Sequence, residues 1–219
     1  MLVEHGISLL IDVTRHFGEQ ARWLDGVDAI LLTHAHRDAS GGLGRLRAWW
    51  QRMGMEAPLP VYAHRDTIAA VRRRFGRLDQ CRFVEASPGV ARRLGGWSVT
   101  PLEVPHALER RYPTYAWRLR DRARTVVYAS DVATLTPELR RFARGASVLV
   151  IDGAMWGRRL FSHLTIDAEL PALCEWKVDT ILLTQIGKTA PPHRELERAV
   201  AALCRRARPA YDGLSLELA

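Results

Sequence analysis

The feature that most constrains this chain is a histidine-rich loop between an apolar strand and a helix. Residues 29–32, Ala-Ile-Leu-Leu, have the length and branching of a strand that is buried on both faces. The following loop carries His34, His36 and Asp38 at alternate positions, and two glycines then precede an amphipathic stretch that predicts a helix over 43–53. Alternate spacing in an extended loop brings His34 and His36 within reach of one ion. This pattern indicates a metal site at the carboxyl end of a strand, where open α/β sheets bind ligands.

A second stretch of the chain repeats this strand and the start of its loop. Residues 178–185, VDTILLTQ, differ from residues 27–34, VDAILLTH, at only two positions. The repeat predicts two related strand-loop-helix halves that face each other across a sandwich, with both strand ends directed at one site. Gln185 then has in the second half the place that His34 has in the first.

The remaining chain alternates between strand and helix patterns. Gly95 and Gly96 mark a tight hairpin turn between two of the strands. No linker or low-complexity segment interrupts the pattern, so we predict a single domain over 1–219. Strands are predicted at 7–13, 61–63, 82–84, 89–94, 97–104, 115–120, 125–129 and 148–152 with a short β segment through 211–213, and helices at 18–24, 66–75, 137–144, 166–176 and 195–206.

The composition is that of a soluble globular protein, with 47% hydrophobic and 26% charged residues. No apolar run approaches the roughly 20 residues of a membrane helix, and the first residues lack the basic flank of a signal peptide. Cys81, Cys174 and Cys204 are odd in number and far apart, which fits neither a disulfide framework nor a zinc knuckle. We expect buried, inert thiols in a reducing environment, and therefore a cytoplasmic protein without a membrane partner.

The formal net charge is +8, and it comes almost entirely from arginine, since Lys177 and Lys188 are the only lysines. Attraction to phosphate-bearing ligands and GC-biased codon usage both explain this bias, and the scattered arginines leave both interpretations open. The arginines at 72–74 fit a solvated helix face. No basic arm or aromatic-basic stripe favours a nucleic-acid partner. A homodimer is compatible with the sequence.

Residues 33–42, THAHRDASGG, resemble the THxHxDHxGG signature of the metallo-β-lactamase superfamily. The resemblance implies an α/β protein with a four-layer αββα sandwich. It covers nearly the whole chain apart from the first strand of the family, which normally precedes the strand at 7–13. Without that strand, the chain has either a shortened start or an uncovered edge.

The resemblance also implies a metal site. Carried over residue by residue, it makes His34, His36 and His106 the three imidazoles of a first metal site. Asp131 would be the carboxylate that bridges two metals in the hydrolytic members. Three imidazoles and a carboxylate suit zinc, with manganese or iron as alternatives. His64 also follows a strand, but we expect it to be structural.

A second metal site is incomplete by the same comparison. Asp38 would belong to it, together with histidines at positions 39 and 185. This sequence has Ala39 and Gln185 there. Alanine has no donor atom, so we predict an intact first site, a defective second site and one metal ion per chain.

Other segments indicate the reaction. His163-Leu164-Thr165 before a helix resembles a segment of phosphodiesterase branches, including the tRNA-end-processing nucleases, in which that histidine acts on phosphate. Segments 104–107, 128–131 and 210–213 are similar to those of the phosphoribosyl cyclic phosphodiesterases. The resemblance implies hydrolysis of a small or cyclic phosphodiester by a metal-bound hydroxide, with Asp38 orienting the water or accepting its proton. Lys188 and His193 would contact the phosphate, or simply belong to a polar loop.

Two other functions fit the same residues. The losses at positions 39 and 185 would also suit a pseudoenzyme or metal-binding module that kept the fold without efficient turnover. A thioester or lactone hydrolase of the same fold is the third interpretation, against which the basic charge argues only weakly.

Overall fold

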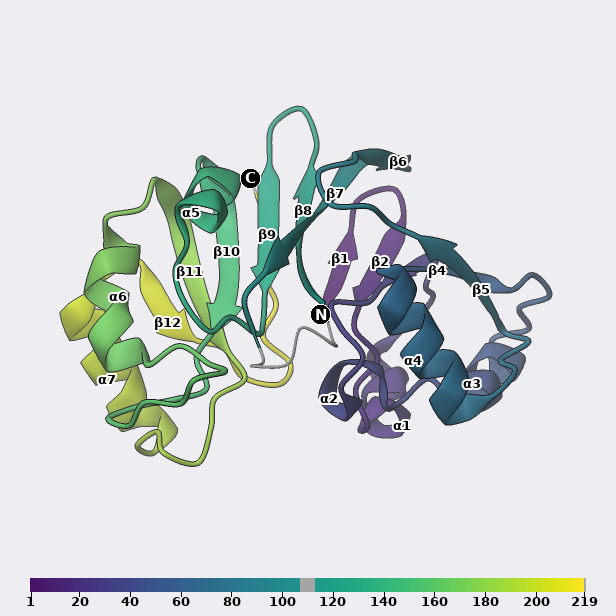
Figure 1. The fold of residues 1–219 in the computed structure, drawn as a ribbon, viewed down its shortest axis with the longest axis horizontal. Coiled ribbons are helices and arrows are strands. Elements are labelled where there is room, and N and C mark those ends of the chain that lie inside the picture. Colours follow the sequence, from purple (N-terminus) through teal and green to yellow (C-terminus); the bar gives the residue numbers. More distant parts are fainter. Residues whose placement is uncertain (107–112, 219) are drawn as a thin grey trace.

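The computed structural model has two β-sheets that face each other between two layers of helices (Figure 1). It describes residues 1–106 and 113–218. Within these residues, one sheet has the strand order β1-β2-β3-β4-β5 and the other has the order β12-β11-β10-β9-β8-β7-β6. The predicted four-layer αββα sandwich is confirmed, whereas its assignment as one domain over 1–219 stays a prediction.

The first half of the chain forms the smaller sheet and its helices. Strands β2 to β5 are parallel, and β1 is antiparallel to β2. Helices α1, α3 and α4 cover the outer face of this sheet through a core that includes Phe17, Leu46 and Val71. The elements are β1 (Leu2–Glu4), β2 (Ser8–Ile11), α1 (Phe17–Gln20), a 3-10 turn (Ala21–Trp23), β3 (Ala29–Leu31), α2 (Arg37–Ser40), α3 (Leu46–Arg52), β4 (Leu59–Ala63), α4 (Arg65–Phe75) and β5 (Cys81–Glu85).

The second half forms the larger sheet. Strands β9 to β12 are parallel, while β6 to β9 form an antiparallel meander. Leu139 of α5, Leu170 of α6 and Leu196 of α7 belong to the core cluster on its outer face. The elements are β6 (Arg92–Leu94), β7 (Trp97–Val104), β8 (Thr114–Arg120), β9 (Thr125–Ala129), α5 (Pro137–Ala143), β10 (Ala146–Asp152), α6 (Ile166–Cys174), β11 (Val178–Thr184), α7 (His193–Leu203) and β12 (Ala207–Pro209).

Alternating side chains along the central strands produce the four layers. In β3, Ala29 and Leu31 pack between the two sheets, whereas Ile30 packs against the helices of the first half. In β11, Leu182 packs between the sheets and Leu183 packs against the helices of the second half. Because both faces of these strands are buried, their sequences are continuous apolar runs.

Several boundaries differ from the sequence prediction. The short strand β1 pairs with β2 and covers its edge, so the uncovered edge, one of the two expected alternatives, is wrong. The β segment expected through 211–213 is wrong, because the last strand is β12, which ends at Pro209. The strand expected at 89–94 is confined to Arg92–Leu94, and α2 was not anticipated.

The prediction of three free thiols is also wrong. Cys174 ends α6 and Cys204 follows α7, and the two are joined by a disulfide with Cα atoms 5.6 Å apart. Cys81 is a free thiol. The argument from cysteine usage to a reducing compartment therefore no longer holds. A cytoplasmic location stays a prediction.

Within residues 1–106 and 113–218, no helix has the length and apolar character needed to cross a membrane.

Candidate functional site

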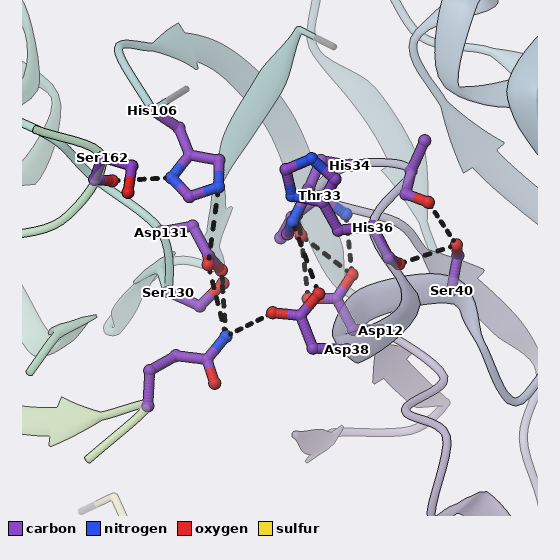
Figure 2. A network of polar contacts seen from close by, with 12 residues as sticks. Asp12, Thr33, His34, His36, Asp38, Ser40, His106, Ser130, Asp131 and Ser162 are labelled. Carbon is purple, nitrogen blue, oxygen red and sulfur yellow. Dashed lines mark hydrogen bonds and ion pairs between the residues drawn. The ribbon is translucent and has the colours of Figure 1, made fainter. Parts of the chain in front are cut away.

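Polar side chains gather at one edge of the sandwich, where strands of both sheets end (Figure 2). The internal repeat predicted this meeting point, since β3 and β11 are its two strands. Both Asp12 and Gln185 have left-handed backbone conformations, with φ of 63° and 60°. Non-glycine residues adopt this conformation rarely, and mostly where the surrounding structure holds them at a functional site. The residues at this edge are Asp12 after β2, His34 after β3, His106 after β7, Asp131 after β9, Asp152 at the end of β10 and Gln185 after β11.

The three histidines predicted as metal ligands lie together. The ring centroids of His34 and His36 are 4.7 Å apart, and that of His106 lies 5.2 Å from His34 and 5.4 Å from His36. One nitrogen from each ring lies within 4.8 Å of the other two, a spacing that could hold a metal ion. Burial lowers the pKa of His34 to about 4 and also lowers the pKa of His36. Both rings therefore favour the neutral form that binds metals.

A hydroxyl orients His34. The Thr33 hydroxyl lies 2.8 Å from Nδ1 of His34 and 2.9–3.0 Å from the Asp12 carboxylate, which also accepts the Thr33 backbone N–H at 2.8 Å. When Thr33 donates to the ionised Asp12, it accepts a hydrogen bond from Nδ1 and leaves Nε2 as a bare lone pair. Burial raises the pKa of Asp12 to about 8, and the hydrogen bonds from Thr33 oppose this shift, so this tautomer of His34 forms as Asp12 loses its proton.

His106, which follows strand β7 of the other sheet, is also oriented through its Nδ1 atom. Its Nδ1 lies 2.8 Å from the carbonyl oxygen of Ser162. A carbonyl only accepts, so Nδ1 carries the proton and Nε2 is left as a lone pair. This Nε2 lies 3.9 Å from Oδ1 of Asp131. The sequence predicted His106 but gave no sign of its partner, since a backbone oxygen has no sequence signature.

Two aspartates complete the centre. Asp131 is buried, and its Oδ2 accepts the Ser130 hydroxyl at 2.6 Å. Burial alone would raise the pKa of Asp131, but His34, Ser130 and His106 together lower it. Asp38 is partly exposed, and its Oδ1 lies 3.8 Å from Nε2 of His34. The predicted carboxylates therefore lie beside the three imidazoles (Figure 2).

Gln185 reaches these carboxylates from the second half of the chain. Its side-chain nitrogen lies 3.2 Å from Oδ2 of Asp38 and 3.2–3.3 Å from both oxygens of Asp131. Ala39, the other departure from the signature, is buried and offers no donor side chain. The two residues that differ from the family pattern thus face the same part of the site as Asp38.

His163 lies beside His106, and the centroids of the two rings are 4.9 Å apart. Its Nδ1 lies 2.7 Å from Oδ2 of Asp152, which also accepts the backbone N–H of Val132 and of Ala154. The hydrogen bond that His163 donates to the Asp152 carboxylate raises the pKa of His163 and so favours a protonated ring. The sequence analysis missed Asp152, although its place at a strand end was a usable signal.

The histidine loop is fixed by close backbone packing. A Cβ on Gly42 would lie 2.1 Å from the Thr14 carbonyl oxygen, and one on Gly41 would lie 2.2 Å from that of Arg37. The buried Ser40 hydroxyl contacts the carbonyl of His36 at 2.9 Å. These contacts explain why two glycines follow the loop.

Three other residues singled out in the sequence lie further from the centre. His64 accepts the backbone N–H of Asp66 and caps α4, so its structural role is confirmed. Lys188 is exposed in the loop after β11. His193 begins α7, and its ring contacts that of Tyr211. Its Nε2 lies 3.3 Å from Oε1 of Glu197. Their predicted contact with phosphate stays a prediction.

The side chains at this edge fit a metal ion. Among the described residues, Nε2 of His34 is one of a few buried side-chain polar atoms without a hydrogen-bond partner. An unpaired buried polar atom is costly. Coordination of a cation by this lone pair would remove that cost, and His36, His106 and Asp131 offer the other ligand atoms.

An αββα sandwich with this histidine loop at its strand ends defines a protein of the metallo-β-lactamase type. Residues 8–203 match the family model of the β-lactamase superfamily domain. The chain therefore belongs to the β-lactamase superfamily, and the predicted membership is confirmed.

Two solved structures are similar to this chain over nearly all of its length. A diphosphatase from the PhnP family superposes with a TM-score of 0.86 at 27% identity, over 100% of this chain and 83% of that structure. The short form of human tRNase Z superposes with a TM-score of 0.71 at 13% identity, over 97% of this chain and 89% of that structure, which shows the fold alone.

One curated relative is an octanoyltransferase. The octanoyltransferase of Porphyromonas gingivalis is 25% identical over 226 residues, which cover 98% of this chain and 43% of that protein. The chain thus spans less than half the length of this relative.

Proposed function

We propose that this chain is a metal-dependent hydrolase that cleaves a small or cyclic phosphodiester. The observation that carries the proposal is the juxtaposition of two groups with different tasks. His34, His36 and His106 form a cluster suited to a cation, with Oδ1 of Asp131 3.9 Å from Nε2 of His106. His163, whose pKa is raised by Asp152, lies directly beside His106. A cation site next to a protonatable imidazole suits cleavage of a phosphate ester, in which one oxygen is activated and another must leave with a proton.

The metal ligands would be His34, His36, His106 and Asp131. Three nitrogen ligands and a carboxylate suit zinc first, with manganese or iron as alternatives, and we propose one ion per chain. A divalent cation held there supplies a water of lowered pKa and polarises a phosphoryl oxygen. The Thr33 and Ser162 contacts of the imidazoles orient these ligands, as outer-shell partners do in other metal sites.

Asp38 and His163 would handle the protons. Asp38 has one oxygen facing His34 and the other facing Gln185, so it can orient the attacking water or accept its proton. His163 holds a proton at Nε2 when its ring is charged and can give it to the departing oxygen. Lys188 and His193 would steer the phosphate from the loop after β11.

A substrate panel tests the proposal. Protein loaded with Zn²⁺ or Mn²⁺ is assayed against bis-p-nitrophenyl phosphate, p-nitrophenyl phosphate and an octanoyl thioester, the last because of the octanoyltransferase likeness. We expect the diester to be hydrolysed fastest, and the His106→Ala variant to lose more than about 100-fold of this rate. Turnover of the thioester alone would favour the acyl hydrolase, and a metal-loaded protein that is inactive on the whole panel would favour the pseudoenzyme.

A further inference from the structure

The side-chain amide of Gln185 lies between the carboxylates of Asp38 and Asp131. Its nitrogen is 3.2 Å from Asp38 and 3.2–3.3 Å from the two oxygens of Asp131. A primary amide has two N–H donors, so it can bond one carboxylate with each. Like charges in a partly buried site repel, and a shared donor between them offsets this repulsion.

The backbone of Gln185 is constrained to make this contact. Its φ of 60° lies in the left-handed region, which costs a non-glycine residue about 1 kcal/mol or more and persists only where the surroundings enforce it. Two glycines, one in this loop and one after β10, allow close backbone packing around Gln185. A Cβ on Gly187 would lie 2.1 Å from the Ala154 carbonyl oxygen, and one on Gly153 would lie 2.9 Å from that of Thr184.

Position 39 adds no ligand to the same space. Ala39 is buried, and its carbonyl oxygen accepts the Val13 backbone N–H at 2.7 Å. A second cation there would therefore depend on Asp38, Asp131 and a neutral amide. The amide directs its N–H donors at both carboxylates, so this set offers a second cation no imidazole and no free carboxylate.

We propose that Gln185 is a positioning residue whose amide takes the place of a second cation, holding Asp38 and Asp131 so that the site works with one metal ion. This inference rests on the metal site of the proposed function but not on its substrate. The N–H donors of Gln185 then replace a second cation as the group that bridges Asp38 and Asp131. They hold the two carboxylates in place. Asp131 is then oriented for the first ion by Ser130 on one side and Gln185 on the other.

Manganese binding to the full chain and two variants tests this inference without reference to turnover. Metal-free protein is titrated with Mn²⁺, bound ions are counted after equilibrium dialysis, and the electron paramagnetic resonance spectrum distinguishes single ions from exchange-coupled pairs. Gln185→Glu keeps the length of the side chain but replaces the N–H donors by a carboxylate oxygen. Gln185→Asn tolerates the left-handed backbone but is one methylene too short to reach both aspartates.

We expect the parent to bind one Mn²⁺ per chain with the spectrum of an isolated ion. The Glu variant should bind two ions as a coupled pair, since a third carboxylate completes the second site. The Asn variant should still bind one ion, but about 10–100-fold more weakly, because Asp131 loses a partner that orients it.

Two results would overturn the inference: a parent that binds a coupled pair of ions, or an Asn variant with the parent's affinity together with a Glu variant that still binds one ion. If the Glu variant does not fold, the Asn variant and the parent still decide the question. A parent that binds one ion but cleaves no phosphodiester would refute the proposed function and leave this inference in place.

Discussion

Three histidines of the site are held through their Nδ1 atoms, each by a different kind of partner. His34 has the Thr33 hydroxyl, His106 has the Ser162 carbonyl and His163 has the Asp152 carboxylate. The partner determines what the other nitrogen can do. In a neutral ring, a carbonyl, or a hydroxyl that already donates elsewhere, leaves the other nitrogen as a free lone pair, whereas a carboxylate favours the charged ring. The proposed ligands and the proposed acid therefore differ by their surroundings and not by residue type.

This distinction predicts opposite metal contents for two histidine variants. His106→Ala should lose most bound metal, because it removes one of three imidazole ligands. His64→Ala should keep its metal, because His64 only caps α4, and should lose about 1 kcal/mol of stability. Elemental analysis of the two dialysed variants measures the metal that each retains. Equal metal loss in both variants would show that the third ligand has been chosen wrongly.

His163 should behave as an acid and not as a ligand. The His163→Ala variant should retain its metal and lose about 10²–10⁴-fold in turnover. In the parent, activity requires the protonated ring, so it should decline as pH rises through the pKa that Asp152 raises. The variant should lack this decline. Metal content and pH–rate profiles of both proteins check the prediction, and loss of metal from the variant would contradict it.

At the residue scale, the sequence predicted side chains that carry chemistry but not those that orient them. His34, His36, Asp38, His106 and Asp131 were all anticipated, and the structure brings them together. Asp12 and Thr33 were not assigned a role, because their contact joins loops after two different strands. Such partners depend on the register between strands, which a single sequence does not reveal.

At the scale of elements, periodicity predicted the central strands well because their apolar runs are buried on both faces. Short elements were less accessible. Helix α2 spans only Arg37–Ser40 within the histidine loop, and its existence depends on the packing of that loop against residues 13–17. The disulfide escaped prediction because Cys174 and Cys204 are 30 residues apart and approach only when α6 and α7 pack together.

The packing of this loop predicts that Gly42→Ala destabilises the protein by about 1–3 kcal/mol, since the new methyl group would overlap Thr14 and Phe17. Gly26→Ala is the matched control, because no heavy atom lies within 4 Å of its added Cβ. Chemical denaturation of both variants measures the difference. Equal stabilities would show that the loop does not need the close approach.

The disulfide predicts one reactive thiol among the three cysteines. Unfolded without reductant, the protein should react with a thiol reagent once, at Cys81. In the folded protein near pH 8 this reaction should be slow, because burial raises the pKa of Cys81 to about 12 and leaves little thiolate. Reduction should lower the free energy of unfolding by about 3–4 kcal/mol for this loop. Three reactive thiols in the unreduced protein would contradict the pairing.

At the scale of the whole molecule, the site exists only because the two sheets meet. His34, His36 and Asp38 belong to the half of the chain that forms the first sheet, whereas His106, Asp131, His163 and Gln185 belong to the half that forms the second. Direct hydrogen bonds join the two halves beside the site, from the Tyr115 backbone N–H to Thr33 at 2.9 Å and from the Trp117 indole to Leu32 at 3.1 Å. The internal repeat predicted this meeting of strand ends, but only the packing of aromatic side chains between the sheets sets its distances.

The central claim is that one metal ion at this meeting point supports hydrolysis of a phosphodiester. The most direct measurement is a titration of metal-free protein with Zn²⁺ while the hydrolysis of bis-p-nitrophenyl phosphate is followed. Our account predicts no turnover without metal, a linear rise with added ion and a plateau at one equivalent per chain. Turnover by the metal-free protein, or a rise that begins only after the first equivalent and ends at the second, would contradict it.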